Sequence, residues 1–169
     1  TAFEQIQWGK MPIAICGGSE SMIWESFMAA WCKLRVMSKQ NEAPGTACRP
    51  FDKNRDGMVM ADGAGILVLE DYDHAKARGA KPIAEIIGFD SSCDAFHITA
   101  PSVEGQVRAV QGALDDAKVC PTDVQYINAH GTSTKLNDLT ETQTIKQVFG
   151  NRSYQIPVSS IKSMLGHSI

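Results

Sequence analysis

Short apolar runs alternate with polar, helix-like segments along the chain. Five compact runs bounded by Gly, Pro or polar residues predict buried strands, at 13–16 (IAIC), 64–70 (AGILVLE), 83–89 (IAEIIGF), 124–129 (VQYINA) and 156–160 (IPVSS). Gly17 and Gly18 are expected to end the first run in a turn. Strands separated by such long connections favour an α/β fold with a largely covered sheet, whose chemistry lies in loops beyond the strand ends.

Helices are expected between these runs. Residues 71–78 are polar and stop at Gly79. Within 103–117, valine, leucine and alanine recur at steps of about four and three, which is typical of a helix with one buried face. Asp138, followed by Glu141, predicts a capping-box-like start for a helix that Gly150 closes. Residues 38–63 are rich in Pro, Gly, Asn and Asp and predict a long irregular loop.

The composition is that of an ordinary globular protein, with 43% apolar and 21% charged residues among 169. Sixteen Lys and Arg against 19 Asp and Glu give a formal charge of −3, which argues against a nucleic-acid or anionic-membrane partner. No apolar run approaches the roughly 20 residues that cross a bilayer, and the first residues lack the features of a signal peptide. We therefore expect no membrane association and a cytoplasmic protein. The five cysteines are widely spaced and predict free thiols.

Several conventional motifs are incomplete or absent. Residues 52–57 (DKNRDG) copy the first half of an EF-hand calcium loop, but the twelfth position holds Gly63 where a bidentate carboxylate is needed. A turn whose Asp and Asn side chains bond local amides is expected there instead. The GxSxG and GxGxxG motifs do not occur. Cys93 and His97 combine a thiol and an imidazole four residues apart, but an isolated Cys and His are more often structural.

Two loops that follow predicted strands carry the side chains best suited to catalysis. His130 follows the run 124–129 and is framed by threonines, while Lys162 and His167 follow the run 156–160 in the sequence SSIKSMLGH. Two imidazoles and an ammonium at strand ends can converge on one pocket. A single histidine is more often structural, but this combination predicts an active site.

Four segments, in this order, resemble the successive motifs of β-ketoacyl-[acyl carrier protein] synthases of the elongating type: CRPFDKNRDGMVMADGAGILVLEDYDHAKARGAK, CDAFHITAP, INAHGTST and VSSIKSMLGH. The resemblance implies part of the five-layered αβαβα thiolase fold. Residues 1–80 would end its first half and residues 81–169 would begin its second. The chain is then expected to be an internal fragment, inactive alone, with the family's nucleophilic cysteine roughly nine residues upstream of Thr1.

The resemblance also implies the reaction, a decarboxylative Claisen condensation of an acyl chain with malonyl-[acyl carrier protein], without cofactor or metal. His130 and His167 would donate N–H groups to the thioester oxygen. Lys162 would fix the second histidine and add positive potential, and Asp138 and Glu141 would anchor that lysine.

Further site residues follow from the same resemblance. The phosphopantetheine arm of the carrier would be bound, or its entrance lined, by Thr132, Thr134, Phe96 and His97. Arg35 would meet the acidic carrier protein, and Trp31 would line the acyl pocket. A homodimer or a ketosynthase heterodimer is expected. Three alternatives stay open: a ketosynthase subunit specific to type II polyketide synthesis, a non-catalytic chain-length partner subunit, and a degradative thiolase.

Overall fold

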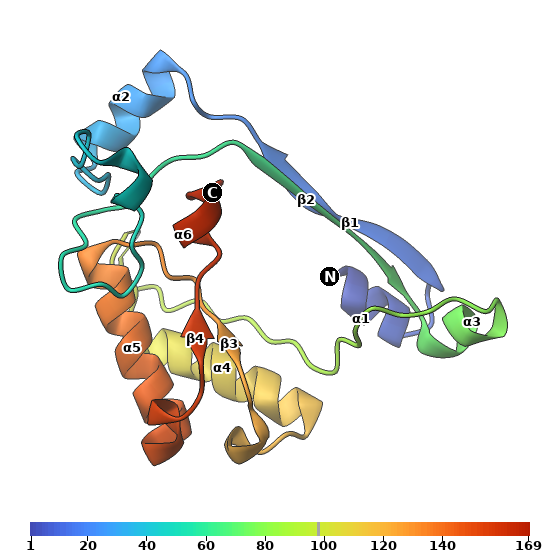
Figure 1. Ribbon diagram of the computed structural model, residues 1–169. Helices are drawn as coiled ribbons and strands as arrows, with labels where there is room; N and C mark the ends of the chain where they lie inside the picture. The colour runs from blue at the N-terminus through green and yellow to red at the C-terminus, as the bar shows by residue number, and fades with distance from the viewer. Residues whose placement is uncertain (98) are drawn as a thin grey trace.

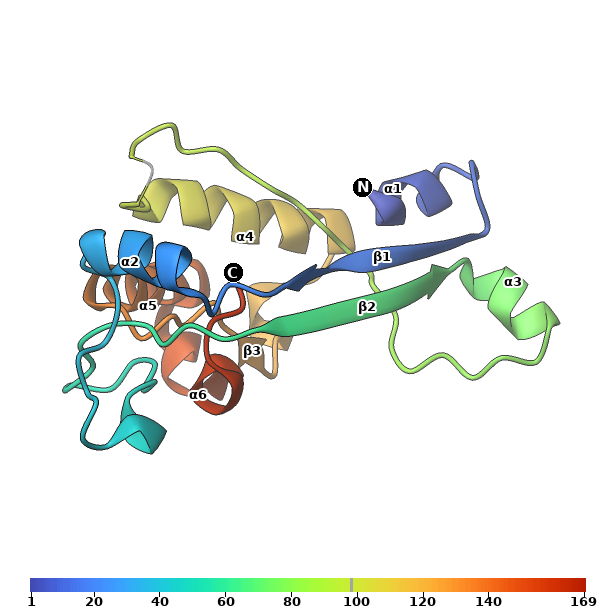
Figure 2. The ribbon, with the colours of Figure 1, turned by 90° about the horizontal axis from the view of Figure 1, so that it is seen from above.

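The computed structural model describes residues 1–97 and 99–169, and Figure 1 shows two long antiparallel strands beside a group of helices with a short parallel sheet. The long strands, β1 (Ile13–Glu20) and β2 (Gly63–Glu70), pair along their whole length. The short helices α1 (Ala2–Gln7) and α3 (Tyr72–Ala77) lie at one end of this strand pair (Figure 2). The middle of β2 stays exposed, so the predicted cover of the sheet is absent for this pair in the described part of the chain.

The first strand is longer than predicted, and the turn expected at Gly17 and Gly18 is wrong. Both glycines stay paired with β2, opposite Ile66 and Gly65. Gly17 has a φ of 153°, and a Cβ atom at this position would overlap the carbonyl oxygen of Gly65. Glycine therefore lets the two strands approach closely here, and does not end their pairing. The predicted strand 64–70 is confirmed.

The predicted helices are confirmed, one of them with an earlier start. The α3 helix is capped by Asp71, and α4 (Val103–Ala117) is capped by Ser102. The α5 helix (Lys135–Phe149) begins after Thr134, whose hydroxyl accepts the backbone N–H of Asn137. The sequence suggested Asp138 as the cap of this helix, and that prediction is wrong. Asp138 is a first-turn residue that faces inward and is 1% exposed.

Residues 83–89 do not form the predicted strand, and no described residue pairs with them in a ladder. The segment runs along α4 instead, where Gly88 lies against Ala113 and Ala117 and the amide of Phe89 donates to Asp116 Oδ2 at 2.9 Å. An apolar run shows that a segment can be covered, but a strand also needs a neighbouring backbone to pair with.

The strands that carry the two histidine loops are short and parallel. β3 (Ile127–Asn128) pairs with β4 (Val158–Ser159), so each covers only part of the predicted runs 124–129 and 156–160. The chain passes from one to the other through α5, the kind of crossover that parallel neighbours require. Because parallel strands end at the same edge, the loops after β3 and β4 lie side by side (Figure 1).

The predicted loop 38–63 is confirmed as irregular, apart from the 3-10 turn η1 (Pro44–Thr46) and the first residue of β2. It follows α2 (Glu25–Lys33) and closes a small core in which Met22, Met58 and Met60 are buried. The remaining elements are the 3-10 turns η2 (Pro121–Asp123) and η3 (Gly150–Tyr154) and the helix α6 (Lys162–Leu165). Within the described residues, no helix has both the length and the apolar character that a membrane span requires.

Candidate active site

His130 lies just after β3, and its backbone is hydrogen bonded to a side chain of α5. Glu141 Oε1 accepts the N–H of His130 at 2.7 Å, and Glu141 Oε2 accepts the N–H of Gly131 at 2.8 Å. Asn137 donates to the same carboxylate at 3.2 Å. Charge-assisted bonds to backbone amides are stronger than neutral ones, so Glu141 fixes the course of the chain at His130.

The second loop is tied to residues 48–61 on its other side. The N–H of His167 donates to the carbonyl of Val59 at 2.7 Å, and the carbonyl of His167 accepts from Ala61 at 2.9 Å. The Cys48 thiol donates to the carbonyl oxygen of Lys162 at 2.9 Å. Segments far apart in sequence therefore position the lysine and the histidine.

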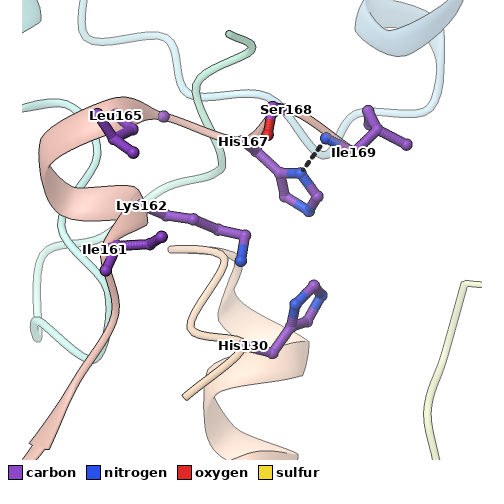
Figure 3. Close-up of a pocket in the computed structure, with 8 residues that line it drawn as sticks. His130, Ile161, Lys162, Leu165, His167, Ser168 and Ile169 are labelled. Carbon is purple, nitrogen blue, oxygen red and sulfur yellow. Dashed lines mark hydrogen bonds between the residues drawn. The ribbon is translucent and has the colours of Figure 1, made fainter. Parts of the chain in front are cut away.

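The two loops bring His130, Lys162 and His167 together around one cavity of about 230 Å³. The imidazole rings lie edge to face, with centroids 5.4 Å apart and planes at 88°. Figure 3 shows the Lys162 side chain extending toward the space between the rings. The backbone N–H of Ile169 donates to His167 Nδ1 at 2.9 Å, so the neutral ring carries its proton on Nε2. Among the described residues this N–H group has no hydrogen-bond partner, and its ring lines the cavity.

The surroundings keep both imidazoles neutral near pH 7. Burial, followed by the charge of Lys162 and the proximity of His130, lowers the pKa of His167 to about 4. Burial and then Lys162 also lower the pKa of His130, against the opposing charges of Glu141 and Asp138. His130 nevertheless retains exposed surface. Two neutral N–H donors and a nearby cation are suited to stabilise a developing oxyanion.

Asp138 and Glu141 lie beside the site, but the expected anchoring of Lys162 is not formed: neither carboxylate makes an ion pair with this lysine among the described residues. Asp138 accepts the N–H of Phe51 at 2.8 Å and pairs with Arg55 at 3.3 Å. Both carboxylates thus accept backbone N–H groups, and Asp138 also pairs with the side chain of Arg55.

The two threonines after His130 are close to the site and already hydrogen bonded. Thr132 is 5% exposed, and its hydroxyl lies 2.8 Å from that of Thr134. Thr134 also caps α5. The structure thus places both threonines in the loop that carries His130, although neither lines the cavity.

The other predicted site residues do not line this cavity. Phe96 and His97 are exposed on the connection before α4, where the N–H of Thr99 donates to His97 Nδ1. Arg35 is exposed after α2, and its φ is 58°. Trp31, on α2, packs against the methionine core described above.

Two residues at the site escaped prediction. Arg55 bonds the carbonyls of Thr134 and Lys135 at 3.1 and 2.8 Å, and so fastens the loop 38–63 to the start of α5. Ser160 joins the two histidine loops through its hydroxyl. An arginine in a polar loop gives no sequence signal for such contacts, whereas a serine directly after a predicted strand gives a weak one.

The calcium-like segment forms the expected turn, in which Asp52 Oδ1 accepts the N–H of Asn54 at 2.7 Å. All five cysteines are free thiols. Cys93 and His97 are both exposed, and their predicted structural role stays a prediction.

A model of the β-ketoacyl synthase N-terminal domain matches residues 1–75, and a model of the C-terminal domain matches residues 83–169. The chain therefore belongs to the β-ketoacyl synthase family.

Among curated relatives, the 3-oxoacyl-[acyl-carrier-protein] synthase 2 of Synechocystis sp. is 51% identical over 98% of this chain and 40% of its own length. The enzyme of the same name from Staphylococcus aureus is 49% identical over 98% of this chain and 41% of its length. The chain thus spans about 40% of the curated relatives it matches.

Solved structures confirm the predicted partial thiolase fold. One match is a chain from the complex of a type II polyketide synthase acyl-carrier protein with its ketosynthase bound to the hexaketide. It has a TM-score of 0.95 and 40% identity, over 99% of this chain and 42% of that one. A β-ketoacyl synthase from Burkholderia phymatum matches with a TM-score of 0.93 and 44% identity, over 99% and 40% of the two chains.

Proposed function

We propose that the protein containing this chain condenses an acyl chain with malonyl-[acyl carrier protein], as a β-ketoacyl synthase of fatty acid or polyketide synthesis. In this proposal the chain supplies the site that activates the malonyl thioester. The observation that carries it is the pair of neutral imidazoles, with ring centroids 5.4 Å apart, in one cavity with Lys162. Family membership supports the same reaction.

The chemistry follows from the donors in the cavity. When the malonyl carboxylate leaves as carbon dioxide, the C–C bond electrons form an enolate whose negative charge develops on the thioester oxygen. The Nε2–H group of His167 and an N–H group of His130 would donate to that oxygen. The Lys162 ammonium adds a positive potential. The enolate carbon then attacks the acyl group held as a thioester elsewhere in the protein, and the thiolate leaves.

The roles assigned to residues outside the cavity are part of the same proposal. Thr132 and Thr134 would meet the phosphopantetheine arm, and Phe96 and His97 would stand at its entrance. The exposed position of Arg35 supports contact with an acidic acyl carrier protein. We also propose that the protein is a dimer and is cytoplasmic, and that the boundary between its thiolase-like halves lies near residue 80.

Trp31 and the methionine core that it packs against would together line the acyl pocket. Methionine side chains are flexible, so such a pocket can adapt to acyl chains of different shape.

The test is the release of carbon dioxide from malonyl-[acyl carrier protein] by the full-length protein. We expect His130→Ala and His167→Ala each to reduce this release by at least ~100-fold, as removal of an oxyanion donor does, while acyl transfer to the protein continues. His74→Ala is the matched control, because this histidine is exposed on α3 and, among the described residues, its ring bonds Glu70 and its backbone bonds Asp71 and Arg78, all outside the cavity. A wild-type rate in either active-site variant would refute the assignment.

Failure of the wild-type protein to decarboxylate malonyl-[acyl carrier protein] would refute the catalytic proposal as a whole. It would favour the alternative of a non-catalytic partner subunit, in which the same fold is kept without turnover.

A further inference from the structure

Ser160 occupies the contact between the two loops that carry the catalytic groups. It is 5% exposed and follows β4 directly. Its hydroxyl donates to the carbonyl of Gly131 at 2.8 Å and lies 3.2 Å from that of His130. The same oxygen accepts the N–H of Lys162 at 3.3 Å. Among the described residues, this hydroxyl makes the only side-chain hydrogen bonds between residues 130–134 and 160–169.

The backbone at Gly131 shows how closely the loops approach each other. Gly131 has a φ of 44°, and a Cβ atom added there would lie 2.5 Å from the Cβ of Ser160. Only glycine fits both this backbone conformation and this separation. The Gly131 residue is itself buried, so its carbonyl oxygen has few alternatives to the serine as a partner.

We propose that Ser160 is a positioning residue that sets the distance between His130 and the Lys162–His167 loop. The proposal rests on the proposed function, in which both imidazoles must meet one oxyanion. Ser160 touches no substrate in this arrangement and acts through the two loops. One hydroxyl that donates to one loop and accepts from the other fixes both at once.

The hydroxyl should matter for one half-reaction more than for the other. Without it the Gly131 carbonyl loses its donor and the loops can separate slightly, and a displacement of about 1 Å at a catalytic group can cost ~100-fold in rate. Decarboxylation uses both histidines on one oxygen and is sensitive to that spacing. Acyl transfer to the nucleophile needs neither ring as an oxyanion donor in the proposed mechanism.

The experiment compares Ser160→Ala with Ser163→Ala in the full-length protein. Ser163 is a serine of the same loop, whose hydroxyl donates to the carbonyl of Ser160 at 3.0 Å and bonds nothing in the His130 loop. We expect Ser160→Ala to lower kcat for malonyl decarboxylation by ~10- to 100-fold, with acyl transfer within about twofold of wild type. Ser163→Ala should leave both rates within about twofold.

A second variant keeps the test decisive if Ser160→Ala does not fold. Ser160→Cys retains a weaker donor of similar size, and its decarboxylation rate should fall between those of wild type and Ser160→Ala. A folded Ser160→Cys or Ser160→Ala protein that decarboxylates at the wild-type rate overturns the proposal. An equal loss of decarboxylation and acyl transfer also overturns it, because that result indicates a purely structural role.

An NMR readout separates this proposal from the proposed function. In protein labelled at histidine, Ser160→Ala should shift the ring resonances of both His130 and His167, whereas Ser163→Ala should leave them in place. If the wild type shows no decarboxylation, the proposed function fails, and the NMR comparison alone decides the positioning role. Unchanged resonances in Ser160→Ala would overturn it.

Discussion

Replacing Lys162 with methionine tests whether its ammonium keeps the two histidines neutral. Methionine preserves an unbranched side chain and removes the charge. Burial is the largest cause of the low pKa of both rings, and Lys162 is the second cause for each. The pKa values of both rings should therefore rise in the variant. That of His167 should rise from about 4 yet stay below its ordinary 6.5, because burial and His130 still lower it.

The effect is large enough to measure in the acid range. At pH 6, an imidazole with a pKa of 6.5 is about three-quarters charged, whereas one with a pKa of about 4 is about 1% charged. Protonation would place a hydrogen on His167 Nδ1, which now accepts the N–H of Ile169, and so would disturb the ring orientation. Loss of decarboxylation on acidification should therefore begin at a higher pH in the variant than in the wild type.

The assay is a pH titration of the histidine ring resonances by NMR, with carbon dioxide release measured on the same samples. Lys146→Met is the matched control. This lysine lies in the last turn of α5, over the ring of Tyr154, and does not line the cavity. It should leave both titration curves unchanged. If the pKa values in Lys162→Met stay the same or fall, Lys162 does not supply the positive potential, and the electrostatic account of the site is wrong.

Further predictions concern stability. Arg55→Met should lower the free energy of unfolding by ~3–5 kcal/mol in urea titrations, because Asp138 is left buried without its cation; a loss under ~1 kcal/mol would contradict this. Gly131→Ala should lower it by ~1–3 kcal/mol through backbone strain and contact with Ser160, and an unchanged unfolding midpoint would oppose that reasoning. Stability should also decrease as the pH falls from about 6.5 to about 4, since unfolded His167 binds a proton there and folded His167 does not; a parallel decrease in His167→Ala would refute the linkage.

The two loops that carry His130, Lys162 and His167 could be predicted because their signals are local. A histidine directly after an apolar run, and a lysine and histidine after another, are visible without knowledge of the fold. Helix α4 was equally clear, since its apolar positions follow the helical period over 15 residues. The irregular loop 38–63 was evident from its composition alone.

The errors arise where a partner distant in sequence decides the outcome. Residues 83–89 have the apolar character of a strand, but their neighbour is α4 and not another strand. The start of α5 was misplaced because Thr134 and Asp138 are both good caps, and the choice depends on which side chain is drawn inward. Asp138 turns toward Phe51 and Arg55, residues that precede it by more than 80 positions.

The partners of Asp138 and Glu141 also bear on the electrostatics of the site. Had Asp138 and Glu141 paired with Lys162, their charges would have cancelled most of its positive potential at the histidines. Asp138 instead pairs with Arg55 and accepts the Phe51 N–H, and Glu141 accepts the N–H groups of His130 and Gly131. The lysine charge thus remains available to the rings, and it lowers the pKa of both. The polar loop 38–63 therefore bears on the charge at the site, since Arg55 pairs with a carboxylate that opposes Lys162 at His130.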